Sequence, residues 1–273
     1  MMACVEFAKG HGTANDFVII PDPDGRLDLS PEQVEALCDR RRGLGGDGLL
    51  RVVRTRALAL NADAEWFMDY RNADGSISEM CGNGVRVYAR YLVESGLAAG
   101  PTLPILTRAG LVVAEVDDET IAVELPPPRL LGRSTVRLRG DAYAGIVVDV
   151  GNPHLVCPVP DPSTVDLSVA PELDPSEFPN GGNVELVATE GVHVRMRVVE
   201  RGVGETMSCG SGAMAAAAVA LAEAGLAEGT ATVEVPGGRL TVTVRDGRAI
   251  LAGPAVIVAT GVVVPARASV PAL

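Results

Sequence analysis

Two cysteines in this chain lie in matching sequence surroundings that suit proton-transfer chemistry. Cys81 begins the sequence CGNG and Cys209 begins CGSG, and a helix-forming stretch follows each, ending at Gly96 and Gly225 respectively. We therefore expect both thiols at helix N-termini, where unpaired N–H groups and the helix dipole can lower a cysteine pKa from about 8.5 toward neutrality. The same N–H groups form a site for an anion such as a carboxylate.

A single Cys-Gly-x-Gly sequence would be explained equally well by a small cysteine packed under a glycine turn. The second copy, roughly one domain length away, favours two related halves that share one task. In such a pair, a thiolate removes a proton from one face of a stereocentre, and a thiol delivers a proton to the opposite face. This reaction needs no cofactor if the site stabilises the carbanion.

Other chemistries find less support in the sequence. His11, His154 and His193 lie far apart, and neither Cys-x-x-Cys nor His-x-x-x-His spacing occurs, which argues against a metal site. The sequence GLGGDG at 43–48 matches G-x-G-x-x-G, but it precedes a predicted strand instead of following one. We interpret it as a glycine turn and not as a dinucleotide site. A cysteine protease would need one thiol with a histidine base, not two equivalent thiols.

Composition indicates a soluble protein of two domains. The chain has 273 residues, 47% hydrophobic and 21% charged, which is enough for two packed cores. Its net charge of −12 and its 3% of aromatic residues argue against nucleic acid or an anionic membrane as a partner. Residues 1–6 lack the apolar region of a signal peptide, and the longest apolar run, 213–222, is too short to cross a bilayer. We therefore expect a cytoplasmic protein.

The other three cysteines are predicted to be structural. Cys4 and Cys157 lie in strand-like runs, and Cys38 lies on the apolar face of a short predicted helix, where a thiol behaves as a small apolar side chain. The total of five cysteines is odd and gives no disulfide framework, so a reducing compartment would keep all of them as thiols.

The pattern of apolar residues predicts many short strands and one dominant helix in each half. This favours an α+β fold with mainly antiparallel sheets, because helices do not alternate with strands as βαβ units require. A proline run at 126–128 is typical of a linker and divides the chain into half-domains 1–126 and 127–260, with the last strand near 260–273 as a candidate to complete the first. A short helix is expected over 31–42. The expected strands are 5–9, 16–20, 49–54, 66–70, 102–107, 110–116, 120–124, 134–138, 144–150, 155–159, 184–189, 192–199, 230–236, 240–245, 249–252 and 255–264.

Five motifs along the chain closely resemble the diaminopimelate epimerase family. They cover both halves in the family's order, and the last of them is rarely met outside that family. The motifs are GTANDF at 12–17, NADG at 72–75, EMCGNG at 79–84, GNPH at 151–154 and ERGVGET at 200–206.

The resemblance implies a fold, an activity and an assembly. The fold would be two pseudo-symmetric domains, each an antiparallel sheet wrapped around a central helix, with the substrate in the cleft between them. The activity would be isomerisation of LL-2,6-diaminopimelate to the meso form by two bases, without pyridoxal phosphate or any other cofactor, in lysine and peptidoglycan biosynthesis. A homodimer is also implied.

The resemblance also implies roles for individual residues. Cys81 and Cys209 match the two catalytic thiols, and His154 and Glu200 match residues that assist them. Arg201 would clamp the carboxylate of the non-reacting centre, as planar guanidinium recognition favours. The substrate-binding matches are the side chains of Asn15, Asn72, Asn83, Asn152 and Asn183, Glu200 itself, and the backbone N–H groups of Gly82, Asn83, Gly210 and Ser211. Without the resemblance, an ordinary turn role would explain Asn15, Asn72 and Asn183 better.

The chain departs from the family pattern at two positions. Gly48 stands where many members carry a glutamine that helps to bind the distal end of the substrate, and Ser211 replaces a frequent threonine. The first departure leaves open an alternative, a related amino-acid racemase or isomerase of the same fold with a different side-chain preference. Proline-type racemases lack the polar distal site, and phenazine-type isomerases lack the thiol pair, so retention of both features favours the epimerase.

Overall fold

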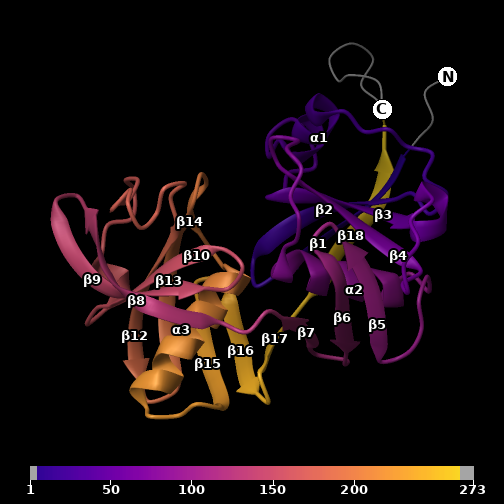
Figure 1. Cartoon of the computed structure of the whole chain (residues 1–273). Coiled ribbons are helices and arrows are strands. Elements are labelled where there is room, and N and C mark those ends of the chain that lie inside the picture. Colours follow the sequence, from indigo (N-terminus) through magenta and orange to yellow (C-terminus); the bar gives the residue numbers. More distant parts are fainter. Residues whose placement is uncertain (1–4, 265–273) are drawn as a thin grey trace. The chain divides into compact units, whose positions relative to one another are not determined.

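The chain folds into two compact units. The computed structural model describes residues 5–264. One unit contains residues up to Val123 together with those from Pro254 onward, and the other is Glu124–Gly253. Each unit is built around one long helix, α2 (Gly82–Glu94) in the first and α3 (Gly210–Glu223) in the second (Figure 1). The predicted α+β class, with sheets packed around a central helix, is confirmed.

The predicted end of the second half at residue 260 is too late. Strand β18 (Val256–Val263) pairs antiparallel with β1 (Val5–Gly12) and therefore belongs to the first unit. Figure 1 shows β18 in yellow beside the indigo start of the chain. The apolar pattern of this strand marks it as a strand but carries no information on its partner. The remainder of the expected final strand, 265–273, lies outside the described residues.

In the first unit, the strands pack against α2. Neighbouring strands are antiparallel except for two parallel pairs, β2 with β3 and β4 with β5. Helix α2 contacts β1, β2, β6 and β18, among others, and buries Val85, Val87 and Tyr88 completely. The strands are β1, β2 (Asn15–Pro21), β3 (Gly48–Arg54), β4 (Trp66–Asn72), β5 (Thr102–Thr107), β6 (Gly110–Val116), β7 (Ile121–Leu125, which crosses the unit boundary) and β18; the short 3₁₀ helix η1 is Thr55–Leu58.

Helix α1 (Pro31–Cys38) is shorter than the predicted range 31–42. It begins with a capping box, in which Ser30 accepts from the backbone of Gln33 and the Gln33 side chain accepts from the backbone of Ser30. It ends because Asp39 is extended and its carboxylate accepts hydrogen bonds from the backbone of Arg41 and Arg42, 2.8 Å each. A side chain that binds nearby backbone N–H groups in this way competes with the helix.

In the second unit, the strands surround α3. Strands β10 and β12 are a parallel pair, as are β13 and β15, and the other pairings within this unit are antiparallel. Strand β8 begins directly after the predicted proline linker, earlier than expected, and β11 and β14 were not predicted. The strands are β8 (Arg129–Leu138), β9 (Asp141–Asp149), β10 (Pro153–Pro158), β11 (Glu172–Leu173), β12 (Asn183–Glu190), β13 (His193–Glu200), β14 (Gly204–Thr206), β15 (Gly229–Val235), β16 (Gly238–Arg245) and β17 (Arg248–Gly253); the 3₁₀ helix η2 is Pro162–Thr164.

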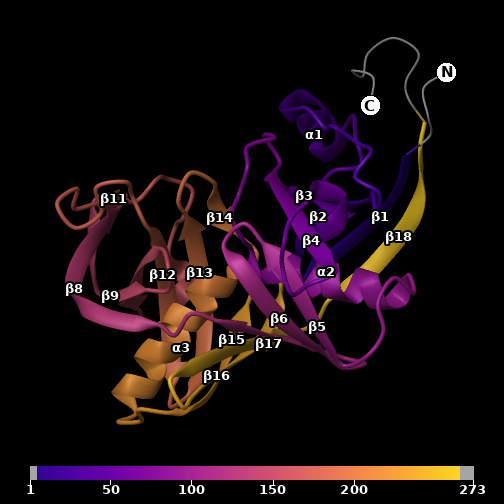
Figure 2. The same ribbon diagram turned by 45° about the vertical axis from the view of Figure 1, so that its right-hand side comes forward.

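The alanine-rich composition of α3 explains its central position. Residues 213–217 are fully buried, and the helix is apolar around most of its circumference, as expected for a helix enclosed by other elements. Its short side chains allow β13, β15 and β16 to pack close to it, and Figure 2 shows α3 in orange beside β15 and β16. None of the helices in the described part of the chain is long and apolar enough to span a membrane.

Candidate active site

The thiol of Cys81 occupies the N-cap position of α2, as predicted. Its backbone is extended, with φ −142° and ψ 120°, and its Sγ accepts a hydrogen bond from Gly84 N at 3.4 Å. Gly82 and Asn83 are the first helical residues, and their backbone N–H groups lie at the N-terminus of the helix. Gly96, with φ 69°, closes the helix in the left-handed conformation that glycine favours.

Two asparagines predicted to bind substrate lie beside Cys81. Asn15, on the β1–β2 hairpin, brings its Oδ1 within 3.8 Å of Cys81 Sγ and accepts a hydrogen bond from Asn83 Nδ2 at 3.2 Å. The Asn15 amide in turn donates to Asp47 at 2.8 Å. The structure therefore brings Asn15, Cys81 and Asn83 together. Asn72, at the end of β4, donates to Ser76 Oγ at 2.9 Å in the loop that follows.

Gly48 has a packing reason to be glycine. A Cβ atom at this position would lie 2.6 Å from the Arg71 carbonyl oxygen and 2.7 Å from the ring of Tyr70. Tyr70 itself is nearly buried and meets Phe17 edge to face, with ring centroids 5.9 Å apart. The tyrosine ring thus occupies the space that a side chain at position 48 would need. This departure from the family pattern reflects packing within β3 and β4.

Arg86, on the first turn of α2, was not among the predicted site residues. Its side chain is fully buried, and its guanidinium lies 3.4 Å from Gly82 O and 3.3 Å from Thr13 Oγ1. Burial lowers the pKa of Arg86 to about 10, and the Cys81 charge acts in the opposite direction. The residue could have been noticed in the sequence as a cation inside an otherwise apolar helix face.

The thiol of Cys209 repeats the geometry of Cys81 in the second unit. It is the N-cap of α3, with φ −122° and ψ 118°, and its Sγ accepts from Gly212 N at 3.4 Å. The side chain of Ser211 lies 3.4 Å from the same sulfur. Gly210 and Ser211 are the first helical residues and present N–H groups without partners in the helix. Gly225, with φ 72°, closes this helix as predicted.

The expected lowering of the cysteine pKa is wrong for Cys209. Burial raises the pKa of this thiol well above its ordinary value, and the negative charges of Glu200 and Glu185 raise it further. The bonds from Ser211 and Gly212 lower it, but they do not compensate. A helix N-terminus stabilises a thiolate by a modest amount, and full burial next to carboxylates costs more. Burial and nearby negative charge therefore favour the protonated form of Cys209.

A buried histidine–carboxylate pair lies in the strands beside Cys209. His154, the predicted assistant, is fully buried, and its Nδ1 is 2.7 Å from Glu185 Oε1. Its Nε2 is 3.1 Å from Asn152 Oδ1 and 3.4 Å from Asn183 Nδ2. The structure therefore places two predicted residues, Asn152 and Asn183, around the imidazole of a third, His154. Glu185 was missed, because a single glutamate in a strand gives no sign of which face it occupies.

Glu200 contacts the Cys209 thiol from β13. Burial raises the pKa of its carboxyl group, and hydrogen bonds from Thr206 and Cys209 lower it in part. The Thr206 bond is 2.5 Å long. A carboxyl group with a raised pKa beside a thiol is suited to exchange protons with it.

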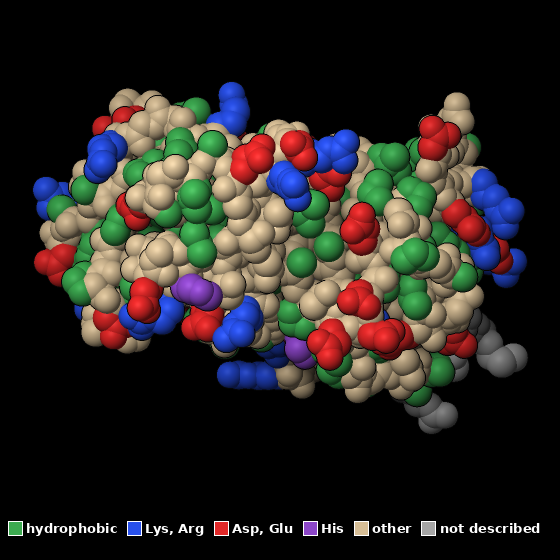
Figure 3. All heavy atoms as spheres, turned by 90° about the horizontal axis from the view of Figure 1, so that it is seen from below, with side chains coloured by type: hydrophobic (Ala, Val, Ile, Leu, Met, Phe, Trp, Pro, Cys, Tyr) green, Lys and Arg blue, Asp and Glu red, His purple; other side chains and the backbone are tan. Residues whose placement is uncertain are grey.

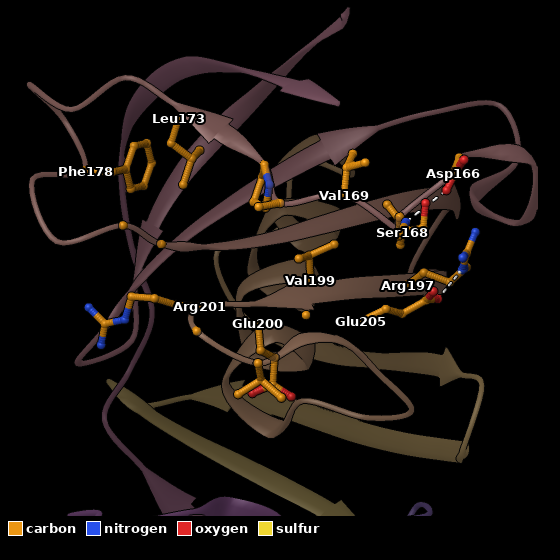
Figure 4. A pocket seen from close by; sticks show the side chains of 18 of the residues that line it. Asp166, Ser168, Val169, Leu173, Phe178, Arg197, Val199, Glu200, Arg201 and Glu205 are labelled. Carbon is orange, nitrogen blue, oxygen red and sulfur yellow. Dashed lines mark hydrogen bonds and ion pairs between the residues drawn. The ribbon is translucent and has the colours of Figure 1, made fainter. Parts of the chain in front are cut away.

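Arg201 follows Glu200 and lies at one end of a pocket of about 740 Å³ within the second unit (Figure 4). Its backbone N–H donates to Asn183 Oδ1 at 3.0 Å, while its guanidinium is exposed and contacts only Asn180 O, at 3.5 Å, among the described residues. Figure 4 shows Val169 and Val199 near the middle of the pocket, with Leu173 and Phe178 on the same side as Arg201. An arginine without a carboxylate partner at a pocket edge is suited to bind an anion.

The surface charge is mixed on the face drawn in Figure 3. Acidic and basic side chains alternate there, and they do not gather into a basic stripe of the kind that binds nucleic acid. Among the described residues, no three His, Cys, Asp or Glu side chains are placed to hold a metal ion.

Solved structures share this fold. A phenazine biosynthesis protein of the PhzF family from Bacillus anthracis matches with a TM-score of 0.71 and 21% identity, covering 97% of this chain and all of that chain. A hydroxyproline epimerase from Agrobacterium vitis matches with a TM-score of 0.66 and 13% identity, covering 96% and 94%. At these identities the likeness establishes the fold alone.

Sequence comparison establishes the class of protein and then the family. Curated diaminopimelate epimerases are similar over almost the whole chain. The protein of Thermobifida fusca is 54% identical over 270 residues, covering 94% of this chain and 97% of the relative, and that of Corynebacterium glutamicum is 50% identical over 279 residues, covering 96% and 99%. The protein is therefore an enzyme, an isomerase that acts as an epimerase. A family model described as diaminopimelate epimerase matches residues 7–131 and 146–264, and the chain belongs to this family.

Proposed function

We propose that this protein converts LL-2,6-diaminopimelate to meso-diaminopimelate by a two-base mechanism with Cys81 and Cys209, without a cofactor. The observation that carries this proposal is the repeated N-cap geometry. In both units, a cysteine Sγ accepts the N–H of the residue three positions later at 3.4 Å, beside the N–H groups of a helix start. Two such thiols are suited to opposite faces of one carbon.

In the proposed reaction, the Cys81 or Cys209 thiolate takes the proton from the α-carbon. The electron pair remains on that carbon and its carboxylate, and the other thiol then donates its proton to the opposite face. The N–H groups at the two helix starts, from Gly82, Asn83, Gly210 and Ser211, stabilise the reacting carboxylate as negative charge develops on it. The proposal requires that both thiols reach the same carbon of the substrate.

The remaining side chains would divide into two groups. His154 and Glu200 assist proton transfer at Cys209, with Asn152 beside the imidazole. Arg201 binds the carboxylate of the non-reacting centre, and Asn15, Asn72 and Asn183 bind polar groups of the substrate. We also propose that the enzyme acts in lysine and peptidoglycan biosynthesis, that it is located in the cytoplasm, and that it forms a homodimer.

Incubation with LL- or meso-diaminopimelate in D₂O tests the two-base reaction. Deuterium at the α-carbon of substrate and product is followed by NMR during the first few per cent of conversion. Two bases predict that the product carries solvent deuterium while the recovered substrate carries little, because the proton is removed by one thiol and replaced by another. A single base would return the same proton, and protium retained in the product would overturn the proposal.

The choice of substrate is tested separately. A panel of amino acids that includes proline and hydroxyproline is compared with LL-diaminopimelate for kcat/KM. We expect diaminopimelate to be the best substrate. An apolar substrate side chain would leave the polar groups of Arg201 and the asparagines without partners, and each unpaired group would cost about 1–3 kcal/mol of binding free energy. A different amino acid with a higher kcat/KM would instead support a related racemase of this fold.

A further inference from the structure

Arg86 is a buried cation close to the Cys81 thiol. It lies five positions after Cys81, on the turn of α2 that faces the β1–β2 hairpin, and its side chain has no solvent exposure. A Cβ atom at Gly12 would lie 3.1 Å from its Nη2, so the hairpin closes over the guanidinium. The nearest polar atoms it contacts, Gly82 O and Thr13 Oγ1, are both uncharged.

This cation has no carboxylate partner among the described residues. No Asp or Glu oxygen there lies within 4.0 Å of the Arg86 guanidinium, and its Nε makes no hydrogen bond. Other buried arginines of the same unit differ, since Arg51 pairs with Asp22 at 2.6 Å. An uncompensated buried charge costs several kcal/mol, so a fold that retains one needs an anion nearby.

We propose that Arg86 is the counter-ion of a Cys81 thiolate, and that it makes Cys81 the base and Cys209 the acid in the enzyme before substrate binds. Arg86 acts through Cys81 and is thus a positioning residue. The inference rests on the proposed two-thiol function and adds to it the protonation state of each thiol. It follows that, before substrate binds, Cys81 is the thiol ready to accept a proton.

The other charges around Cys81 do not reverse this effect. Asp47 reaches the thiol only through Asn15, and its own charge is balanced by Arg40 at 2.6 Å. Asp16, in the same cluster, is paired with Lys9 and Arg40. Glu79 precedes the cysteine by two residues and is exposed. Arg86 is thus a buried charge that lies beside the N-terminus of α2, where Cys81 is located.

The second unit has the opposite arrangement. The position equivalent to Arg86, five residues after Cys209, is Met214, which is fully buried and uncharged. The charged groups facing Cys209 are Glu200 and Glu185, with His154 bonded to Glu185. Negative charge disfavours a second anion at Cys209, while positive charge favours one at Cys81. The two sites therefore share a backbone and differ in electrostatics.

The test measures the pH dependence of alkylation of each cysteine by iodoacetamide in the substrate-free protein. Peptide mass spectrometry separates the five cysteines, and the buried Cys38 and Cys157, whose pKa is raised by burial to about 12, are internal references. In the wild type we expect Cys81 to reach half-maximal rate at a lower pH than Cys209. The apparent pKa is compared because the intrinsic reactivity of a thiolate also changes with its pKa.

Two variants and a matched control assign the effect to the positive charge. Arg86→Met, which copies the residue at position 214, should raise the apparent pKa of Cys81 by at least about one unit, which is a tenfold loss of thiolate at lower pH. Arg86→Lys keeps the positive charge, so the apparent pKa of Cys81 should stay close to the wild-type value. Arg90→Met removes another buried arginine one turn later, which bonds to the carbonyls of Ala255 and Asp117, and should leave Cys81 unchanged.

Several results would overturn the inference. An unchanged Cys81 profile in folded Arg86→Met, with near-ultraviolet circular dichroism as the check of folding, would remove the counter-ion role. If that variant does not fold, a wild-type Cys81 that titrates at or above Cys209 still overturns it, as does an Arg86→Lys profile shifted by a unit or more. None of these readings uses turnover, so they are independent of a failure of the D₂O experiment.

Discussion

The Cys81 and Cys209 sites have the same backbone and opposite surroundings. In both, the thiol caps a helix and accepts an N–H at 3.4 Å. Near Cys81 lie amides and a buried arginine, whereas near Cys209 lie two carboxylates, one of them bonded to His154. The repeated motif therefore fixes where each sulfur lies, and the side chains contributed by neighbouring strands decide its charge. A two-base reaction requires this difference, because one thiol must begin deprotonated and the other protonated.

Removing either thiol should have the largest effect. Cys81→Ala and Cys209→Ala should each lower kcat for epimerisation by about 10³-fold or more, because each removes a general acid or base that no neighbouring group replaces. Steady-state kinetics with LL-diaminopimelate measures this. The corresponding serine variants should still eliminate halide from halogenated substrate analogues, a step that needs one base.

The control for these variants is Cys38→Ala, a buried cysteine in a different core cluster. It should keep full activity and lose about 1 kcal/mol of stability from lost packing. Activity within tenfold of wild type in Cys81→Ala or Cys209→Ala would exclude the two-thiol mechanism.

Glu185→Gln tests whether the carboxylates define the second site. The change removes the carboxylate partner of His154 and weakens the buried 2.7 Å contact with its imidazole, so the free energy of unfolding should fall by about 3 kcal/mol. It also removes a charge that raises the Cys209 pKa, so alkylation of Cys209 should begin at a lower pH. Denaturant unfolding and thiol titration measure the two effects.

Glu190→Gln, at the exposed end of the same strand, is the matched control. It should change the unfolding free energy by no more than about 0.5 kcal/mol and leave the pH dependence of Cys209 alkylation as in the wild type. If Glu185→Gln behaves like this control, the histidine–carboxylate pair contributes nothing to the difference between the two sites.

Arg201→Lys tests the anion-binding role at the pocket edge of the second unit. Lysine keeps the charge but cannot make the two parallel hydrogen bonds of a guanidinium to a carboxylate. Because Arg201 is exposed, we expect kcat/KM to fall by about 10- to 100-fold, mostly through KM, or about 1.4–2.7 kcal/mol. Arg195→Lys, an exposed arginine on β13, is the control. Equal KM values for the two variants would show that Arg201 binds nothing in the substrate.

Gly48→Gln should have the smallest effect on catalysis and a measurable one on stability. A side chain at this position would meet the Arg71 carbonyl and the Tyr70 ring, so overpacking should cost about 1–3 kcal/mol in unfolding free energy. KM for diaminopimelate should change less than about tenfold, or 1.4 kcal/mol. Gly132→Gln, where a Cβ would meet nothing within 4 Å, is the control. A large gain in affinity without a stability loss would show that the glycine tunes specificity.

The sequence by itself determined the local features of both sites. The Cys-Gly-x-Gly turns and the closing glycines predicted where α2 and α3 begin and end, because capping and left-handed glycine are local effects. Strand patterns located most of the strands. The motifs also predicted Asn15, Asn83, Asn152, Asn183 and His154 as site residues, but not which of them lie together.

The tertiary structure decided the features that depend on partners distant in the chain. The pairing of β18 with β1 sets the extent of the first unit, and a strand pattern does not name its neighbour. Helix α1 ends early because Asp39 is extended and its carboxylate accepts the backbone N–H groups of Arg41 and Arg42. The Tyr70 ring that excludes a side chain from position 48 comes from the adjacent strand. Above all, burial beside Glu185 and Glu200 reversed the expected pKa of Cys209, because desolvation and nearby charge are properties of the packed site and not of the helix start.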